Sequence, residues 1–213
     1  GEENMRYHLT RRELALLLAS QKAESVYGFA MPRERYSRNQ VIEILQGLVK
    51  KELVESDGKT FRIELGLRAI LKSIREANYF LHLESASGRS SDVCFYVEEG
   101  ALLVAASVLA QRGDTIRLWH LEKEGLASWM EEAGYLPDCW IDPDILPREG
   151  WEEDRQKLLW SMTGRNKEGI CKMLWLEQGG LYYRLLCHTG DKTSWEFYNR
   201  DQLKRDLAWM MEG

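Results

Sequence analysis

The sequence predicts an α+β fold in which an N-terminal helical segment with a small hairpin precedes a duplicated β-β-β-α unit that forms antiparallel sheet. Two capped helices and an Asp-Gly hairpin fill the first third of the chain, and strands around a glycine turn lead into a helix over residues 93–133. The same order recurs over residues 170–213. In both copies a Gly-Asp turn lies 13 residues before a helical leucine (Gly113 to Leu126, Gly190 to Leu203). Such recurrence indicates an internal repeat.

This pattern divides the chain into four parts. Residues 1–84 are the helical segment and residues 90–134 the first β-β-β-α repeat. Residues 135–169 are a linker that contains three prolines and a helix near 151–162, and residues 170–213 are the second repeat. The serine- and glycine-rich stretch 85–91 has the composition of a connection, so we place the domain boundary there.

Local signals define the elements of the first part. Thr10 with Glu13, and Ser37 with Gln40, are capping boxes that open helices, the first of which we expect to end near Tyr27. Asp57-Gly58 is the central dipeptide of a hairpin between residues 53–55 and 60–63. A further helix is predicted over 67–77, because its apolar residues recur with helical spacing.

This order of elements resembles a winged helix-turn-helix. That resemblance implies that Arg38, Asn39, Gln46 and Lys50 face a major groove and that Lys59 and Arg62 lie near phosphate. The alternative is that the same surface packs against protein. Acidic residues share the surface and would face phosphates unfavourably: Glu34, Glu43, Glu52, Glu55 and Asp57.

The two repeats have matching strands, turns and helices. In the first, strands on either side of Gly100 precede a turn at Arg112-Gly113-Asp114, a strand over 115–121 and a helix over 123–133. In the second, strands are predicted over 170–176, 181–187 and 192–198, with a turn at 189–191 and a helix over 200–211 capped by Asn199. The almost wholly apolar run 101–110 fits a central strand covered on both faces. The repeats could form one pseudo-twofold layer or two sheets paired edge to edge.

Composition and charge exclude several classes of protein. The net charge is −5, with 14 basic and 12 acidic residues in 1–84 and 15 basic and 22 acidic residues in 85–213. The acidic second part argues against nucleic-acid binding there. No run of roughly 18 apolar residues and no secretory leader is visible, and the four cysteines have no metal-ligand spacing. We therefore expect a cytoplasmic protein with reduced thiols and no membrane association.

The sequence shows no catalytic pattern. The four histidines have no Cys, Asp or second His at ligand spacing, and phosphate-binding, dinucleotide-binding and nucleophile-elbow motifs are all missing. Cys187 and His188 are adjacent in a predicted strand, so their side chains point to opposite faces and cannot share a proton. We predict a non-enzymatic protein without metal or cofactor.

The aromatic content indicates protein binding. Eight tryptophans and nine tyrosines are present, and exposed Trp and Tyr are typical of protein interfaces. The predicted binding residues belong to the second sheet: Trp175, Tyr182, Tyr183, Trp195 and Tyr198. The alternative is that these side chains pack in the core.

The order of elements also resembles the EspG family. The resemblance rests on the run Leu53-Val54-Glu55-Ser56-Asp57-Gly58, on the strands and helix that follow, and on their second copy; it covers roughly 40–135 and 170–213. It implies a cytosolic protein of a type VII (ESX) secretion system, with a quasi-twofold α+β fold around an antiparallel sheet and no catalytic activity. Such a protein would be a specific chaperone for a small helical secreted protein of the PE-PPE kind. The alternative is a winged-helix transcriptional regulator with a C-terminal sensing or dimerisation part.

Overall fold

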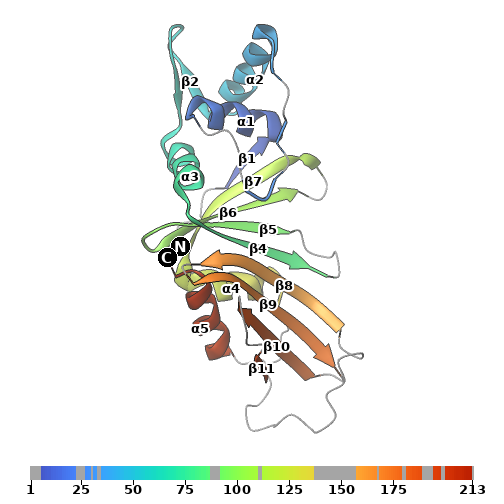
Figure 1. The fold of residues 1–213 in the computed structure, drawn as a ribbon. Helices are drawn as coiled ribbons and strands as arrows, with labels where there is room; N and C mark the ends of the chain where they lie inside the picture. The colour runs from blue at the N-terminus through green and yellow to red at the C-terminus, as the bar shows by residue number, and fades with distance from the viewer. Residues whose placement is uncertain are drawn as a thin grey trace.

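The computed structural model is an α+β protein with one nine-stranded antiparallel sheet (Figure 1). It describes residues 6–22, 27–29, 31–32, 35–86, 92–109, 112–136, 157–166, 168–178, 181–188, 194–197 and 200–212. The elements are β1 (Tyr7–Thr10), α1 (Arg11–Ser20), α2 (Arg38–Lys50), β2 (Val54–Ser56), β3 (Phe61–Ile63), α3 (Leu65–Glu76), β4 (Tyr79–Ser85), β5 (Val93–Val97), β6 (Leu102–Leu109), β7 (Arg112–Glu122), the 3-10 helix η1 (Lys123–Gly125), α4 (Leu126–Glu132), β8 (Lys157–Asn166), β9 (Gly169–Gln178), β10 (Leu181–His188), β11 (Ser194–Phe197) and α5 (Arg200–Met210).

The predicted helices and hairpin of the first part are confirmed. Both capping boxes are formed, with Thr10 and Ser37 as the N-caps of α1 and α2. The prediction that the first helix reaches Tyr27 is wrong. It ends at Ser20, because the backbone turns left-handed at Lys22 (φ 61°), where a helix cannot continue. Whether α1, α2, α3 and the β2–β3 hairpin are a winged helix stays a prediction.

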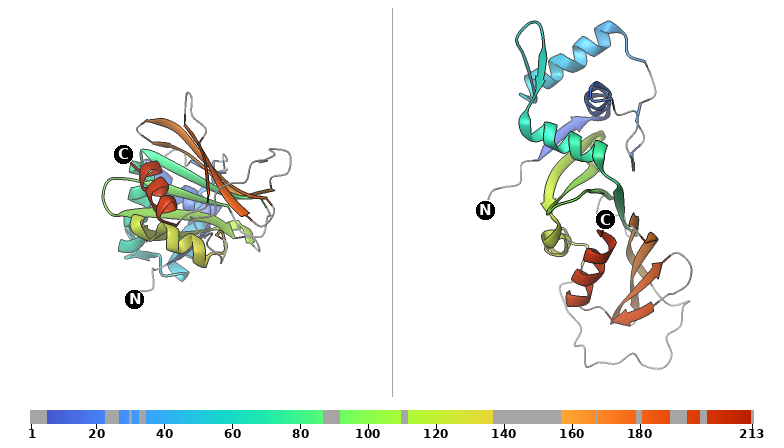
Figure 2. Two further views of the ribbon diagram at one scale, coloured as in Figure 1. Left: turned by 90° about the horizontal axis from the view of Figure 1, so that it is seen from below. Right: turned by 60° about the vertical axis from the view of Figure 1, so that its left-hand side comes forward.

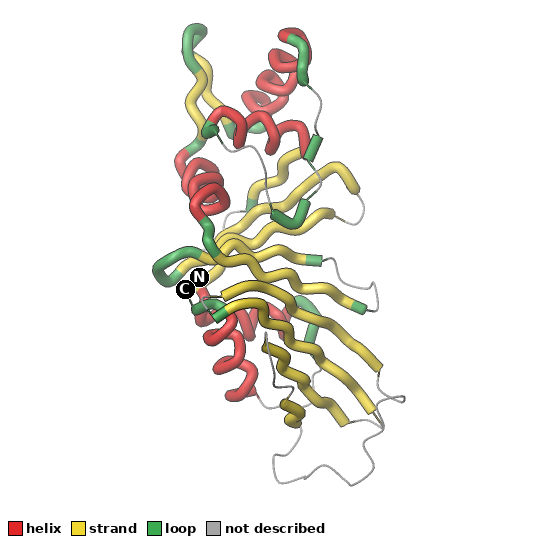
Figure 3. The backbone as a smooth tube through the Cα atoms, viewed as in Figure 1, coloured by secondary structure: helices red, strands yellow, loops and turns green. Residues whose placement is uncertain are grey.

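Two strands of the large sheet come from the first 85 residues. β1 pairs with β7, and β4 pairs with both β5 and β8. The sheet order is β1-β7-β6-β5-β4-β8-β9-β10-β11. Figure 3 shows this continuous run of strands, with α1, α2 and α3 toward the β1 end and α4 and α5 alongside the strands of the second half. The element order contains β5-β6-β7-α4 and β9-β10-β11-α5, each of which follows one more strand. That these two units are an internal repeat stays a prediction. The β4–β8 pair joins the halves into a single layer, so the sheets do not stand apart.

Two sequence predictions about strands and turns are wrong. The helix expected near 151–162 is instead strand β8 from Lys157, where Trp160 and Met162 point to the core in strand alternation. The turn expected at Arg112-Gly113-Asp114 lies within β7, because Arg112 already pairs with Leu109 of β6. The turn expected at 189–191 and the cap Asn199 lie outside the described residues.

Alternating side chains of the central strands give the sheet two cores. On one face, Tyr96, Val104 and Leu118 pack with buried residues of α1, α2 and α3. On the other, Phe95 and Trp119 pack with buried residues of α4, α5, β8 and β9. β5 is buried along its whole length, and β6 is buried over its middle, as predicted for a strand covered on both faces. Figure 2 shows α1, α2 and α3 in one half of the molecule and α4 and α5 in the other.

Candidate functional site

The predicted aromatic binding residues do not all reach the surface. Trp175 is only 1% exposed and its ring stacks on Trp160 with the centroids 5.2 Å apart, so the core-packing alternative holds for this residue. Tyr182 and Tyr183 lie in β10 and Trp195 in β11, the last strand of the sheet, where Trp195 is opposite Leu185. Tyr198 lies outside the described residues.

All six residues predicted for DNA contact are exposed. Arg38, Asn39, Gln46 and Lys50 lie on α2, and Lys59 and Arg62 on the β2–β3 hairpin. We call α2 together with this hairpin the tip, because both project from the end of the molecule (Figure 1). Exposed carboxylates lie among these residues, including Glu43 and Glu55.

Several apolar side chains of the tip remain exposed to solvent. Leu48 of α2 is fully buried, whereas Ile42 and Val49 remain about two-fifths exposed on the flank beside it. Ile42 and Val49 are two helical turns apart and therefore share a face of the helix. On β3, Phe61 is 52% exposed and lies on the same face as Ile63, which packs in the core. The apolar surface of each element thus continues beyond the part that folding buries.

Specific polar contacts join α2 to α1 and close the hairpin. The Lys51 amine just after α2 lies 2.6 Å from Oε1 of Glu13, a buried residue of α1 that also accepts a hydrogen bond from the Thr10 backbone N–H. The hairpin ends where Glu64 N–H donates to the Leu53 carbonyl. The Asp57 carboxylate accepts hydrogen bonds from the Thr60 and Lys59 N–H groups, and these bonds lower the pKa of that carboxyl. The hairpin turn is therefore ordered by its own sequence.

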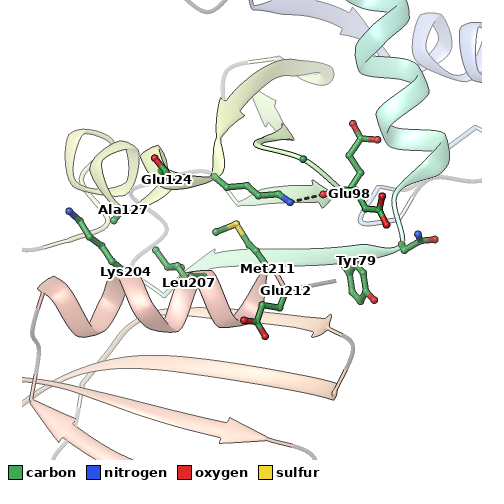
Figure 4. A pocket seen from close by; sticks show the side chains of 13 residues that line it. Tyr79, Glu98, Glu124, Ala127, Lys204, Leu207, Met211 and Glu212 are labelled. Atoms are coloured by element: carbon green, nitrogen blue, oxygen red, sulfur yellow. Dashed lines mark hydrogen bonds between the residues drawn. The ribbon is translucent and has the colours of Figure 1, made fainter.

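A second feature is a cavity of about 810 Å³ where the two halves of the molecule meet (Figure 4). Residues of α5 and the two that follow it form one wall: Lys204, Leu207, Ala208, Met211 and Glu212. The first half supplies the rest from three segments: the start of β4 (Asn78, Tyr79), the β5–β6 turn (Glu98, Glu99, Gly100) and the η1–α4 segment (Lys123, Glu124, Ala127). An ion pair between Arg200 and Glu131, at 3.2 Å, links α5 to α4.

The charged groups on the first-half wall are held by hydrogen bonds. The Lys123 amine donates to the Glu98 backbone carbonyl at 2.6 Å, and the Ser73 hydroxyl donates to the Glu98 carboxylate at 2.7 Å. Burial lowers the pKa of Lys123, and the negative charges of Glu98 and Glu99 oppose this effect. The Lys123 amine is thus held in the cavity wall by its hydrogen bond to the Glu98 carbonyl.

Within the described part of the chain, no three His, Cys, Asp or Glu residues are grouped as metal ligands. His120 is half-buried, and burial lowers the pKa of its imidazole. Cys94 is a buried free thiol whose pKa burial raises to about 12, so it stays protonated and a poor nucleophile at neutral pH. None of the described helices is long and apolar enough to cross a membrane.

Comparison with models of known protein families and with curated protein sequences finds no match. Among solved structures, the chain is similar to the Mycobacterium tuberculosis type VII secretion system chaperone EspG5, solved in complex with a PE25–PPE41 dimer. The alignment covers 96% of this chain and 95% of that one, with a TM-score of 0.59 and 10% sequence identity. The two chains share a fold. The EspG-like architecture expected from the order of elements is confirmed at that level.

Sequence reasoning did not single out the apolar residues of the tip or the cavity. The sequence does contain a sign of the exposed tip residues. The apolar residues of α2 from Val41 to Val49 cover a wider arc of the helix than a single buried face occupies, which indicates that some of them are exposed. The α5 wall was visible as a stripe with helical spacing, but the facing wall combines three distant segments that only the folded chain brings together.

Proposed function

We propose that this chain is a non-enzymatic, cytoplasmic adaptor or specific chaperone that binds another protein through its tip. In its most specific form, the partner is a small helical substrate of a type VII secretion system. The observation that carries the proposal is the apolar surface left exposed on α2 and the hairpin, at Ile42, Val49 and Phe61.

Such a surface is suited to protein recognition. Exposed apolar side chains on projecting elements, here α2 and the hairpin, are typical of interaction sites when polar residues surround them. Phe61 is an aromatic group on a hairpin whose turn is fixed by Asp57, so little conformational entropy is lost when a partner covers it. Exposed basic and acidic residues around it would form the polar rim.

The similarity of fold supports the same kind of function. EspG5 is a chaperone seen in complex with a dimer of two other proteins. At 10% identity the likeness extends to the fold alone, so the partner class is carried over here as part of the proposal.

The test measures binding to secreted helical proteins from the source cell by surface plasmon resonance, with tip variants and a matched control. We expect Phe61→Ser to weaken partner binding by about 30-fold, the effect of losing a central aromatic anchor. Val49→Ser should weaken it less. Leu102→Ser is the control, because Leu102 is 45% exposed but lies on β6, outside the tip. Equal binding by all three variants would contradict the proposal.

A second candidate is a DNA-binding regulator, favoured by the exposure of all six predicted contact residues. It predicts that duplex DNA binds the protein, and that Arg38→Ala and Lys50→Ala each weaken binding and reduce its salt dependence. Phe61→Ser should then have little effect on DNA binding. The two candidate functions are therefore distinguished by which substitution weakens binding: Phe61→Ser for a protein partner, Arg38→Ala or Lys50→Ala for DNA.

A further inference from the structure

We propose that the cavity between the halves binds a short segment of a partner protein in which a lysine or arginine stands next to a bulky apolar residue. The inference rests on the proposed function, because it names the chemistry of a second contact with the same class of partner. The cavity volume of about 810 Å³ is within the range of sites that enclose a ligand of drug size, which suits a few side chains of an extended peptide.

The floor of the cavity is apolar. Leu207, Met211 and Ala127 are buried beneath it, and Ala208 is exposed on the α5 wall. The residues from Lys204 to Glu212 that line it are three or four apart along α5, so one stripe of the helix faces the cavity. An apolar side chain of a ligand that lies on this floor would be removed from water, which is favourable in proportion to the area covered.

One end of the cavity is suited to a cation. Figure 4 shows Tyr79, Glu98 and Glu212 at one end of the cavity and Lys204 with Glu124 at the other. Carboxylates attract an ammonium or guanidinium group, and the face of a tyrosine ring adds a cation–π contact. A basic side chain at the Tyr79 end would therefore meet both groups, while its apolar neighbour covers Met211.

The overall charge of the lining supports a cationic rather than an anionic ligand. Four glutamates and two lysines line the cavity. Of the two amines, that of Lys123 already donates to the Glu98 carbonyl and lies beside Glu98 and Glu99, so it is poorly placed to attract an anion. No ion pair joins Glu99 or Glu124 to another residue of the described part of the chain.

The test uses three fluorescein-labelled synthetic pentapeptides with blocked ends, whose central residues are Leu-Arg-Leu, Leu-Gln-Leu and Ser-Arg-Ser. Binding is measured by fluorescence anisotropy with the full chain. We expect the first peptide to bind more tightly than the other two, and its affinity to fall as salt is raised because part of the attraction is between exposed charges. The amide NMR signals of Gly100 and Ala208 should shift on binding, which locates the peptide in the cavity.

Variants of the lining provide the decisive comparison. Replacing both carboxylates of the turn (Glu98→Gln with Glu99→Gln) should raise the dissociation constant about five- to tenfold, as two partly exposed charge contacts are lost. Ala208→Trp should abolish binding, because an exposed helix position accepts the larger side chain, which fills the cavity. The matched controls are Glu132→Gln and Ala133→Trp, at exposed positions of α4 and its C-cap outside the cavity lining. Both should bind as the unmodified protein does.

Several outcomes would overturn the inference. They are failure of the Leu-Arg-Leu peptide to bind at millimolar concentration, equal binding of the Leu-Gln-Leu peptide, and binding of spermidine without any peptide, which would indicate a site for a small cation. The tip experiment remains separate, because Phe61 lies outside the cavity. Peptide binding that survives Phe61→Ser while partner binding fails supports both proposals. Partner binding that Phe61→Ser leaves unchanged, together with intact peptide binding, removes only the proposed function.

Discussion

Single carboxylates hold the N-terminal elements on the sheet. Glu64 is the N-cap of α3, where its two carboxylate oxygens accept hydrogen bonds from the Gly66 and Leu67 N–H groups at 2.9 and 2.8 Å. Its Oε2 atom also accepts from the hydroxyl of Tyr7 in β1, at 2.8 Å. A side chain on Gly66 would overlap that hydroxyl, so a larger residue there would have to displace the Tyr7 hydroxyl from its position. One carboxylate thus joins a helix start to the edge strand of the sheet.

This arrangement predicts a pH-dependent contribution of Glu64 to stability. Burial opposes ionisation of the carboxyl, but hydrogen bonds from Gly66, Leu67 and Tyr7 outweigh burial and hold its pKa below the ordinary value. In the unfolded chain a Glu titrates near 4.3, so the contribution is complete above about pH 4.3 and is lost as pH falls through the lower folded pKa.

We expect Glu64→Ala to lower the free energy of unfolding by about 1–2 kcal/mol at pH 7, the usual effect of removing an N-cap. In urea unfolding experiments the difference from the unmodified protein should shrink as pH is lowered below about 4.3. Glu55→Ala, at an exposed position of β2, is the control and should have little effect at either pH. A Glu64 effect that is constant across this range would show that the carboxylate charge has no part in the cap.

At the scale of elements, the sequence predicts a structure well when the residues that contact one another are close along the chain. Both capping boxes and the Asp57-Gly58 hairpin were predicted, because their partners are within three residues along the chain. The sequence predicts a helix where strand β8 lies, because short apolar runs do not distinguish the two; of the two strands that pair with β8, β9 follows it directly and β4 lies far back in the chain. The cavity could not be predicted for the same reason, since its walls come from β4, the β5–β6 turn, α4 and α5.

Two adjacent residues of α2, one buried and one exposed, should contribute very differently to stability. Leu48 is fully buried and Val49 is 38% exposed. Truncating a buried leucine leaves a cavity, so Leu48→Ala should lower the free energy of unfolding by about 2–5 kcal/mol. Val49→Ala should change it by less than about 0.5 kcal/mol, because the position is on the open flank of the helix.

Urea unfolding of both variants tests whether Leu48 is buried and the flank with Val49 is exposed. Two equal and large effects would mean that the flank containing Ile42 and Val49 is already covered in the protein without its partner, for example by a second copy of the chain. That result would remove the free apolar surface on which the proposed function depends. Equal and small effects would instead show that α2 contributes little to the core.

At the scale of the whole molecule, the two halves share one core. Phe95, Trp119 and Leu126 of the first half pack in the same cluster as Trp160, Met173 and Leu203 of the second. Within the sheet, the two halves are paired along β4 and β8, where Leu81 is opposite Gly164. A chain built in this way should unfold as one unit, although its halves repeat the same order of elements.

A substitution at the β4–β8 pair tests whether the chain unfolds as one unit. A Cβ at residue 164 would collide with the Phe80 backbone carbonyl and the Leu81 side chain, whereas a Cβ at Gly113 in β7 would meet nothing. Overpacking of this kind costs about 1–3 kcal/mol, so Gly164→Ala should lower Tm by about 2–12 °C, with Gly113→Ala as the unaffected control. Hydrogen exchange followed by mass spectrometry should show faster exchange in β6 of the first half and in β9 of the second, because both depend on the shared core. Faster exchange in β8 and β9 alone would show that the halves open independently, and a partner that bridges the cavity would then be needed to hold them together.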